Sequence, residues 1–187
     1  MGDSEIQTYA NQRGFQQNTL ERWLSWAAAD REALAMLTLS LKISENHLRE
    51  IMDWLEDIAL RDGKPIQDIL AEKPIYDAST DPRLGRADRL KRIKEQLRRR
   101  RFPRLAETED QIRNHINSLK LQPEIRLSVT PGLEGGQLNV EFEAGTTAEF
   151  KAAVGKLSEA TSVDSLPAIF ELLSGNRWRA MLNWPAK

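Results

Sequence analysis

Residues 125–142 read IRLSVTPGLEGGQLNVEF, and apolar residues alternate with polar ones on both sides of a glycine-rich centre. Alternation with a period of two is typical of a strand with one buried face, and proline and glycine between two such runs indicate a turn. The pattern therefore predicts a β-hairpin, in which EIRLSVT and QLNVEFE are the strands and PGLEGG is the turn.

Helical patterns lie on both sides of the predicted hairpin. Pro103 can open a helix that runs to about residue 120. After the hairpin, Thr146 or Thr147 can cap the next helix, and a last helix is expected near residues 165–174. The C-terminal half is therefore expected to be a helix–hairpin–helix (αββα) unit with a C-terminal helix, and the whole chain to be mostly α with a small α+β part.

The first 72 residues predict an acidic helical domain. Residues 1–17 are polar and lack a clear period, so we expect a loosely held arm there. One helical pattern begins at Asn18, and a second begins after Ser44. The second has an acidic face that phosphate would repel, which argues against a helix-turn-helix DNA reader at this place. Its apolar stripe is formed by Leu48, Ile51, Met52, Leu55 and Ile58.

Positive charge is concentrated in residues 89–104, RLKRIKEQLRRRRFPR, where nine of sixteen residues are Lys or Arg. The whole chain carries 27 basic and 28 acidic residues. Like charges four residues apart on a helix repel each other, so a compensating anion is expected. Nucleic acid is our leading expectation, because arginine suits phosphate; an internal or inter-subunit salt-bridge surface and a solvated face are the alternatives. The predicted phosphate contacts are Arg89, Arg92, Arg98, Arg99, Arg100, Arg101 and Arg104.

The sequence does not point to an enzyme. Cysteine is absent, the two histidines are far apart, and neither a phosphate-binding glycine loop nor a zinc-protease motif occurs. We therefore expect no catalytic residues, no metal site and no cofactor. No apolar run is long enough for a membrane span, and a secretory signal is not evident at the N-terminus. The lack of cysteine fits a cytoplasmic location.

Residues 109–157 resemble the C-terminal dimerisation domain of ParB-type partition proteins. An amphipathic helix, a hairpin with glycine at its turn, the second strand LNVEF and a closing helix carry the resemblance. The resemblance implies a homodimer and DNA contacts. A lone two-stranded hairpin is also marginal in water and has open edges, which favours pairing with a second copy. The predicted dimerisation residues are Leu138, Val140, Phe142 and Phe150.

Three segments are expected: an acidic helical domain at 1–72, a linker at 73–86, and residues 87–187 with the basic helix and the αββα domain. The predicted function is a non-enzymatic nucleic-acid-binding accessory protein, acting on DNA, that self-associates and serves in partition or maintenance. A structural adaptor whose basic helix docks on an acidic protein is the alternative. A protein partner is expected for the acidic N-terminal half. In the tail, Trp178 is expected to anchor the chain on the core, with base stacking as the alternative.

Overall fold

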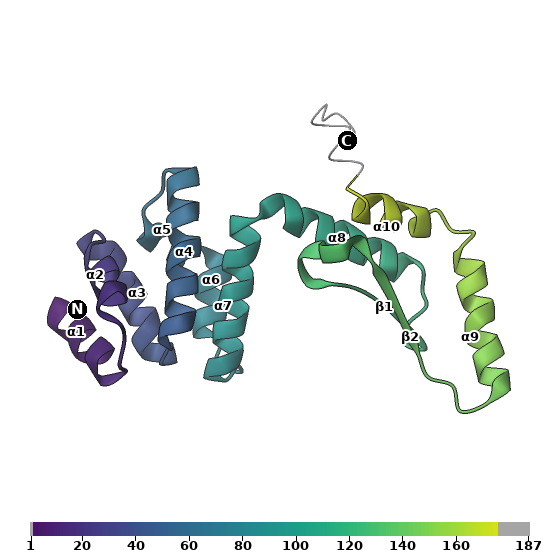
Figure 1. The fold of residues 1–187 in the computed structure, drawn as a ribbon, viewed down its shortest axis with the longest axis horizontal. Helices are drawn as coiled ribbons and strands as arrows, with labels where there is room; N and C mark the ends of the chain where they lie inside the picture. Colours follow the sequence, from purple (N-terminus) through teal and green to yellow (C-terminus); the bar gives the residue numbers. More distant parts are fainter. Residues whose placement is uncertain (1, 176–187) are drawn as a thin grey trace. The chain divides into compact units, whose positions relative to one another are not determined.

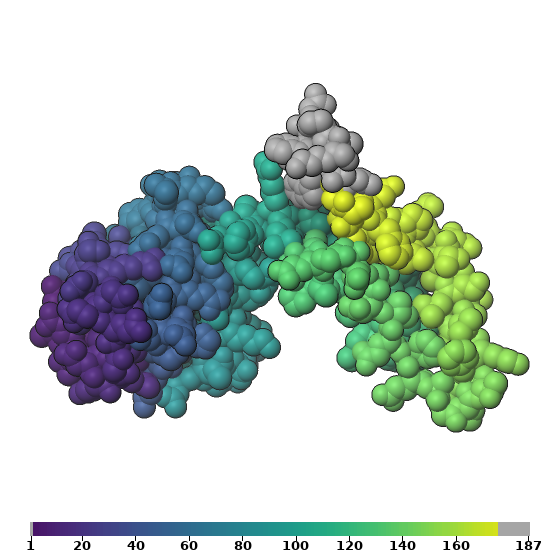
Figure 2. Space-filling view, in the orientation of Figure 1, coloured from purple at the N-terminus to yellow at the C-terminus, as the bar shows by residue number. Residues whose placement is uncertain are grey.

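The computed structural model describes residues 2–175, and the chain divides into two compact units with the boundary between Pro103 and Arg104 (Figures 1 and 2). It is mostly helical with one two-stranded antiparallel sheet, which confirms the predicted fold class. Within the described residues, none of the helices combines the length and the hydropathy that crossing a membrane requires. The expected position of Trp178 lies outside the described residues.

The N-terminal unit is a set of seven helices around one core (Figure 1). Its centre is α4, whose predicted stripe is completely buried, and the left-handed backbone of Gly63 ends that helix. The helices are α1 (Asp3–Gln12), α2 (Gln17–Leu24), α3 (Ala28–Leu41), α4 (Glu45–Asp62), α5 (Ile66–Leu70), α6 (Lys73–Thr80) and α7 (Arg86–Arg101).

The expected loose arm is a helix instead. In α1, Ile6 and Ala10 are buried against the core, and the Tyr9 hydroxyl donates to the carbonyl oxygen of Ile43 at 3.0 Å. The guanidinium of Arg31 binds the carboxylate of Asp3, with an Nε–Oδ1 distance of 2.7 Å. Contacts with residues far along the chain therefore hold a segment whose own sequence is polar.

The predicted linker at 73–86 and the start of the C-terminal domain at 87 are wrong. Residues 73–80 form α6, whose Ile75 and Ala78 are buried in the N-terminal core. Pro74 fits this helix because it stands in the first turn, where the backbone N–H needs no partner inside the helix. The basic helix α7 also belongs to the N-terminal unit, since Ile93 and Leu97 are buried in the same core.

The C-terminal unit contains the predicted hairpin between helices. Its elements are α8 (Pro103–Ser118), β1 (Ile125–Val129), the turn segment η1 (Pro131–Gly136), β2 (Leu138–Phe142), α9 (Thr147–Ala160) and α10 (Ser165–Leu173). The strands pair with Ile125 opposite Phe142, Leu127 opposite Val140 and Val129 opposite Leu138. These six side chains share one face of the sheet, because residues directly opposite in an antiparallel pair point the same way.

Candidate interaction surfaces

Helix α7 places its basic side chains against the acidic helix α4. The ammonium of Lys94 lies 2.6 Å from a carboxylate oxygen of Glu50, and the guanidinium of Arg101 lies 2.5 Å from a carboxylate oxygen of Asp57. The two basic partners are seven positions apart along α7, and the two acidic ones are seven positions apart along α4. Seven residues are about two helical turns, so the two helices align their charges at the same spacing. We call this row of ion pairs between α4 and α7 the charged seam.

Arg100 completes the charged seam by binding two carboxylates. Its guanidinium lies 2.8 Å from Asp62 and 3.1 Å from both oxygens of Glu72, which precedes α6. A hydrogen bond from Arg61 lowers the pKa of Asp62, and the charge of Arg100 acts in the same direction. Arg100 therefore ties α7 to the end of α4 and to the start of α6.

Arg89 and Arg92, in the first half of α7, are held in a different way. Arg89 donates to the carbonyl oxygen of Leu84 at 3.0 Å. Arg92 lies 3.5 Å from Asp81, and this carboxylate also binds Arg83 at 2.9 Å. The hydrogen bonds from Arg83 lower the pKa of Asp81 to about 2. The guanidiniums of Arg83 and Arg92 thus share the carboxylate of Asp81, and both arginine side chains remain well exposed.

Several of the seven predicted phosphate contacts have carboxylate partners within the N-terminal unit, among them Arg92, Arg100 and Arg101. Arg98 is bound by Glu95 of its own helix at 3.0 Å, and Arg99 is only partly exposed. Arg104 belongs to the C-terminal unit. Residues 1–103 together carry 18 basic and 17 acidic side chains. The charge that stands out along the sequence is therefore nearly balanced within the folded unit.

A second ionic cluster joins α2 to α4. The guanidinium of Arg22 lies 2.6 Å from Glu56 and 2.7 Å from Asp53, and the indole N–H of Trp26 donates to Glu56 at 2.8 Å. The hydrogen bond from Arg22 is the main cause that lowers the pKa of Glu56, although partial burial opposes it. This cluster occupies part of the acidic face of α4 that was expected to bind a protein partner.

The C-terminal unit has an apolar surface on β2 and α9, which we call the hairpin surface. Val140, Phe150 and Val154 are 48%, 52% and 45% exposed, whereas Leu138 and Phe142 are half-buried. The rings of Phe142 and Phe150 are 5.6 Å apart, so the strand and the helix form one continuous apolar surface. The four predicted dimerisation residues all belong to it, and Val154 is the member that the sequence analysis missed. Its signal is the spacing of four residues from Phe150 on one helix face.

Among residues 2–175, no group of three or more histidine, aspartate and glutamate side chains is placed to hold a metal ion. The chain matches no known family model, no curated protein and no solved structure. The similarity to partition proteins therefore stays a prediction that rests on the residues quoted for it.

Proposed function

We propose that this protein is a non-enzymatic, cytoplasmic adaptor that self-associates through the hairpin surface, while its N-terminal unit binds a protein partner. The observation that carries the proposal is the continuous exposed apolar surface of β2 and α9. Contiguous apolar surface of this kind is typical of an interaction site.

The second strand has the features of an edge that is covered by another chain. Within the described residues, β2 pairs with β1 alone, so one row of its backbone groups has no partner strand. Open strand edges invite pairing, and natural proteins protect them with charge, proline or a covering element. In β2 the only charged residue is Glu141, at the fourth position. The edge is therefore weakly protected.

The sequence of β2, LNVEF, suits pairing with itself. If two copies pair antiparallel about Val140, this residue faces its own copy, and Leu138 faces Phe142. Asn139 then faces Glu141, so two carboxylates are never directly opposite. Cross-strand apolar pairs stabilise a sheet, and like charges destabilise it. This register satisfies both conditions and extends the hairpin to a four-stranded sheet.

Sedimentation of the full chain tests the proposal. We expect a homodimer at micromolar concentration, and Phe150→Asp should shift the equilibrium to monomer because it puts a charge into the contact. The matched control is Phe170→Asp, since Phe170 is 50% exposed on α10. A monomer at all concentrations, or equal dissociation by both variants, would contradict the proposal.

Nucleic-acid binding, and with it a role in DNA partition or maintenance, is the second candidate. It is favoured by the exposed cations around the start of α7, where Arg83 and Arg92 share Asp81. Lys91 is exposed on the same helix. The arginines of the charged seam already have carboxylate partners, so a nucleic acid would have to displace them. We therefore place any phosphate contact at the first half of α7.

A further inference from the structure

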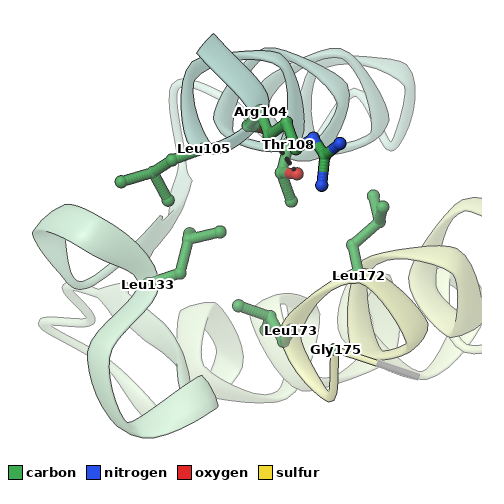
Figure 3. Close-up of a pocket in the computed structure, with 7 residues that line it drawn as sticks. All are labelled: Arg104, Leu105, Thr108, Leu133, Leu172, Leu173 and Gly175. Atoms are coloured by element: carbon green, nitrogen blue, oxygen red, sulfur yellow. Dashed lines mark hydrogen bonds between the residues drawn. The ribbon is translucent and has the colours of Figure 1, made fainter. Parts of the chain in front are cut away.

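The C-terminal unit contains a groove that is separate from the residues of the hairpin surface. It has a volume of about 450 Å³ and is formed by α8, η1 and α10 (Figure 3). Four leucine side chains converge on it, from Leu105, Leu133, Leu172 and Leu173. The hydroxyl of Thr108 donates to the carbonyl oxygen of Arg104 at 3.0 Å, so it needs no partner from a ligand. Arg104 also lines the groove, so the groove favours an occupant that is mainly apolar and tolerates a guanidinium beside it, as an aromatic ring does.

Leu133 reaches the groove at a conformational cost. Its φ is +59°, a left-handed backbone that a leucine rarely adopts. The backbone N–H groups of Leu133 and Gly132 bind Thr130 and Glu109, at 3.0 and 3.3 Å, and fix this turn. Such conformations persist where the surroundings compensate for them. A side chain buried against Leu133 would supply part of that compensation.

The chain itself leads out of this groove. Gly175 follows α10, lines the groove, and has a left-handed φ of +66°. The next twelve residues are NRWRAMLNWPAK, which contain Met181, Leu182 and two of the five tryptophans of the chain. Trp178 is three residues beyond Gly175, a reach of roughly 10 Å when extended. A segment tethered this closely has an effective concentration of about a millimolar or more at the groove.

We propose that the groove is the docking site of residues 176–187 of the same chain, with the indole of Trp178 as the anchor among the four leucines. A large aromatic side chain buries about 150–250 Å² of surface, and the groove has room for an indole with an adjacent methionine or leucine. Docking covers the leucine groove from within the protomer. The hairpin surface then remains exposed as an apolar surface that is open to another chain.

NMR of the full chain with ¹⁵N-labelled tryptophan tests this docking, because each indole N–H gives one signal and Trp→Phe variants assign them. We expect the indole N–H of Trp178 to exchange with water at least about tenfold more slowly than that of Trp184, as burial protects it. Leu133→Asn, which suits the left-handed backbone, and Leu105→Asn should each abolish this difference. The control Leu60→Asn removes a leucine that is 87% exposed in the N-terminal unit, and it should leave the difference unchanged.

Three results would overturn the proposal. The first is equal exchange of the two indoles in the unmodified chain. The second is protection that survives both groove variants. The third is protection that disappears on dilution, because that would assign the groove to the tail of a second copy. If one groove variant fails to fold, the other still decides the test.

Discussion

Replacing Val140 by glutamate should raise the dissociation constant of the proposed homodimer by about two to four orders of magnitude. Burying a whole valine contributes about 1.5–3 kcal/mol. Val140 is 48% exposed, so covering the exposed half in both protomers contributes about 2 kcal/mol. In the proposed register the two glutamates face each other about 5 Å apart. Their repulsion costs about 1–3 kcal/mol for effective dielectric constants of about 80 to 20.

The total loss of association free energy is about 3–5 kcal/mol. Each 1.4 kcal/mol corresponds to about a tenfold change in the dissociation constant. A micromolar dimer would therefore become at best a submillimolar one. Sedimentation equilibrium over a concentration series from well below to well above micromolar measures this shift. The control is Val163→Glu, because Val163 has a similar exposure of 42% but precedes α10.

Charge reversal makes the test specific to the two-fold register. Val140→Lys should dissociate the homodimer as Val140→Glu does. A mixture of the two variants should associate again, because glutamate then faces lysine across the axis. If the mixture stays monomeric while both variants remain folded, Val140 does not face its own copy. If the control Val163→Glu dissociates the dimer equally, the hairpin surface is not the interface.

Three further predictions concern charge and local structure. Lowering the pH below about 4.5 should destabilise the N-terminal unit in thermal melts, because Glu56 has a lowered pKa in the folded state and must then take up a proton; Glu56→Gln should flatten this dependence, and an unchanged slope would count against the cluster with Arg22. Thr146→Ala should destabilise α9 by about 1 kcal/mol, measured by hydrogen exchange, because the Thr146 hydroxyl oxygen accepts a hydrogen bond from the Glu149 N–H, and exchange equal to that of the unmodified chain would refute the cap. If the protein binds nucleic acid, replacing Arg83, Lys91 and Arg92 together by glutamine should make the affinity depend less on salt, as fluorescence anisotropy in a salt titration would measure. A larger loss of affinity in Arg100→Gln/Arg101→Gln, without unfolding, would move the contact to the charged seam.

Local patterns were sufficient for the hairpin and for α4. The period of two in β1 and β2, and the single apolar stripe of α4, each follow from one face of one element being buried. The segments that were missed, α1 and α6, are short and mostly polar, and only two residues of each are buried. Their place depends on contacts such as that of Tyr9 with Ile43, 34 residues away. A pattern within one segment does not contain that information.

The domain boundary was misplaced because two proline-containing breaks compete in this sequence. Residues 73–86 hold two prolines and several turn formers, yet the apolar residues Ile75 and Ala78 bind this segment to the core. The break at Phe102 and Pro103 is shorter, but it is the one at which the N-terminal unit ends. Phe102 leaves the helical conformation, with φ −118° and ψ 65°, because a residue before proline avoids helical geometry. A break therefore marks a domain boundary only where its apolar residues do not pack into the core of the preceding unit.

The arginine run shows how charge that is segregated along a chain can be balanced in space. Residues 1–82 carry a net charge of −7 and residues 83–104 one of +9, and the fold places the two blocks against each other. A matching signal was present in the sequence, since Glu50 and Asp57 are two helical turns apart, as are Lys94 and Arg101. Ion pairs that are partly exposed contribute little each to stability, so the apolar contacts of Ile93 and Leu97 hold α7 in place. The charged seam then fixes which acidic partner each basic residue meets, and it leaves the hairpin surface as the stronger candidate for binding another molecule.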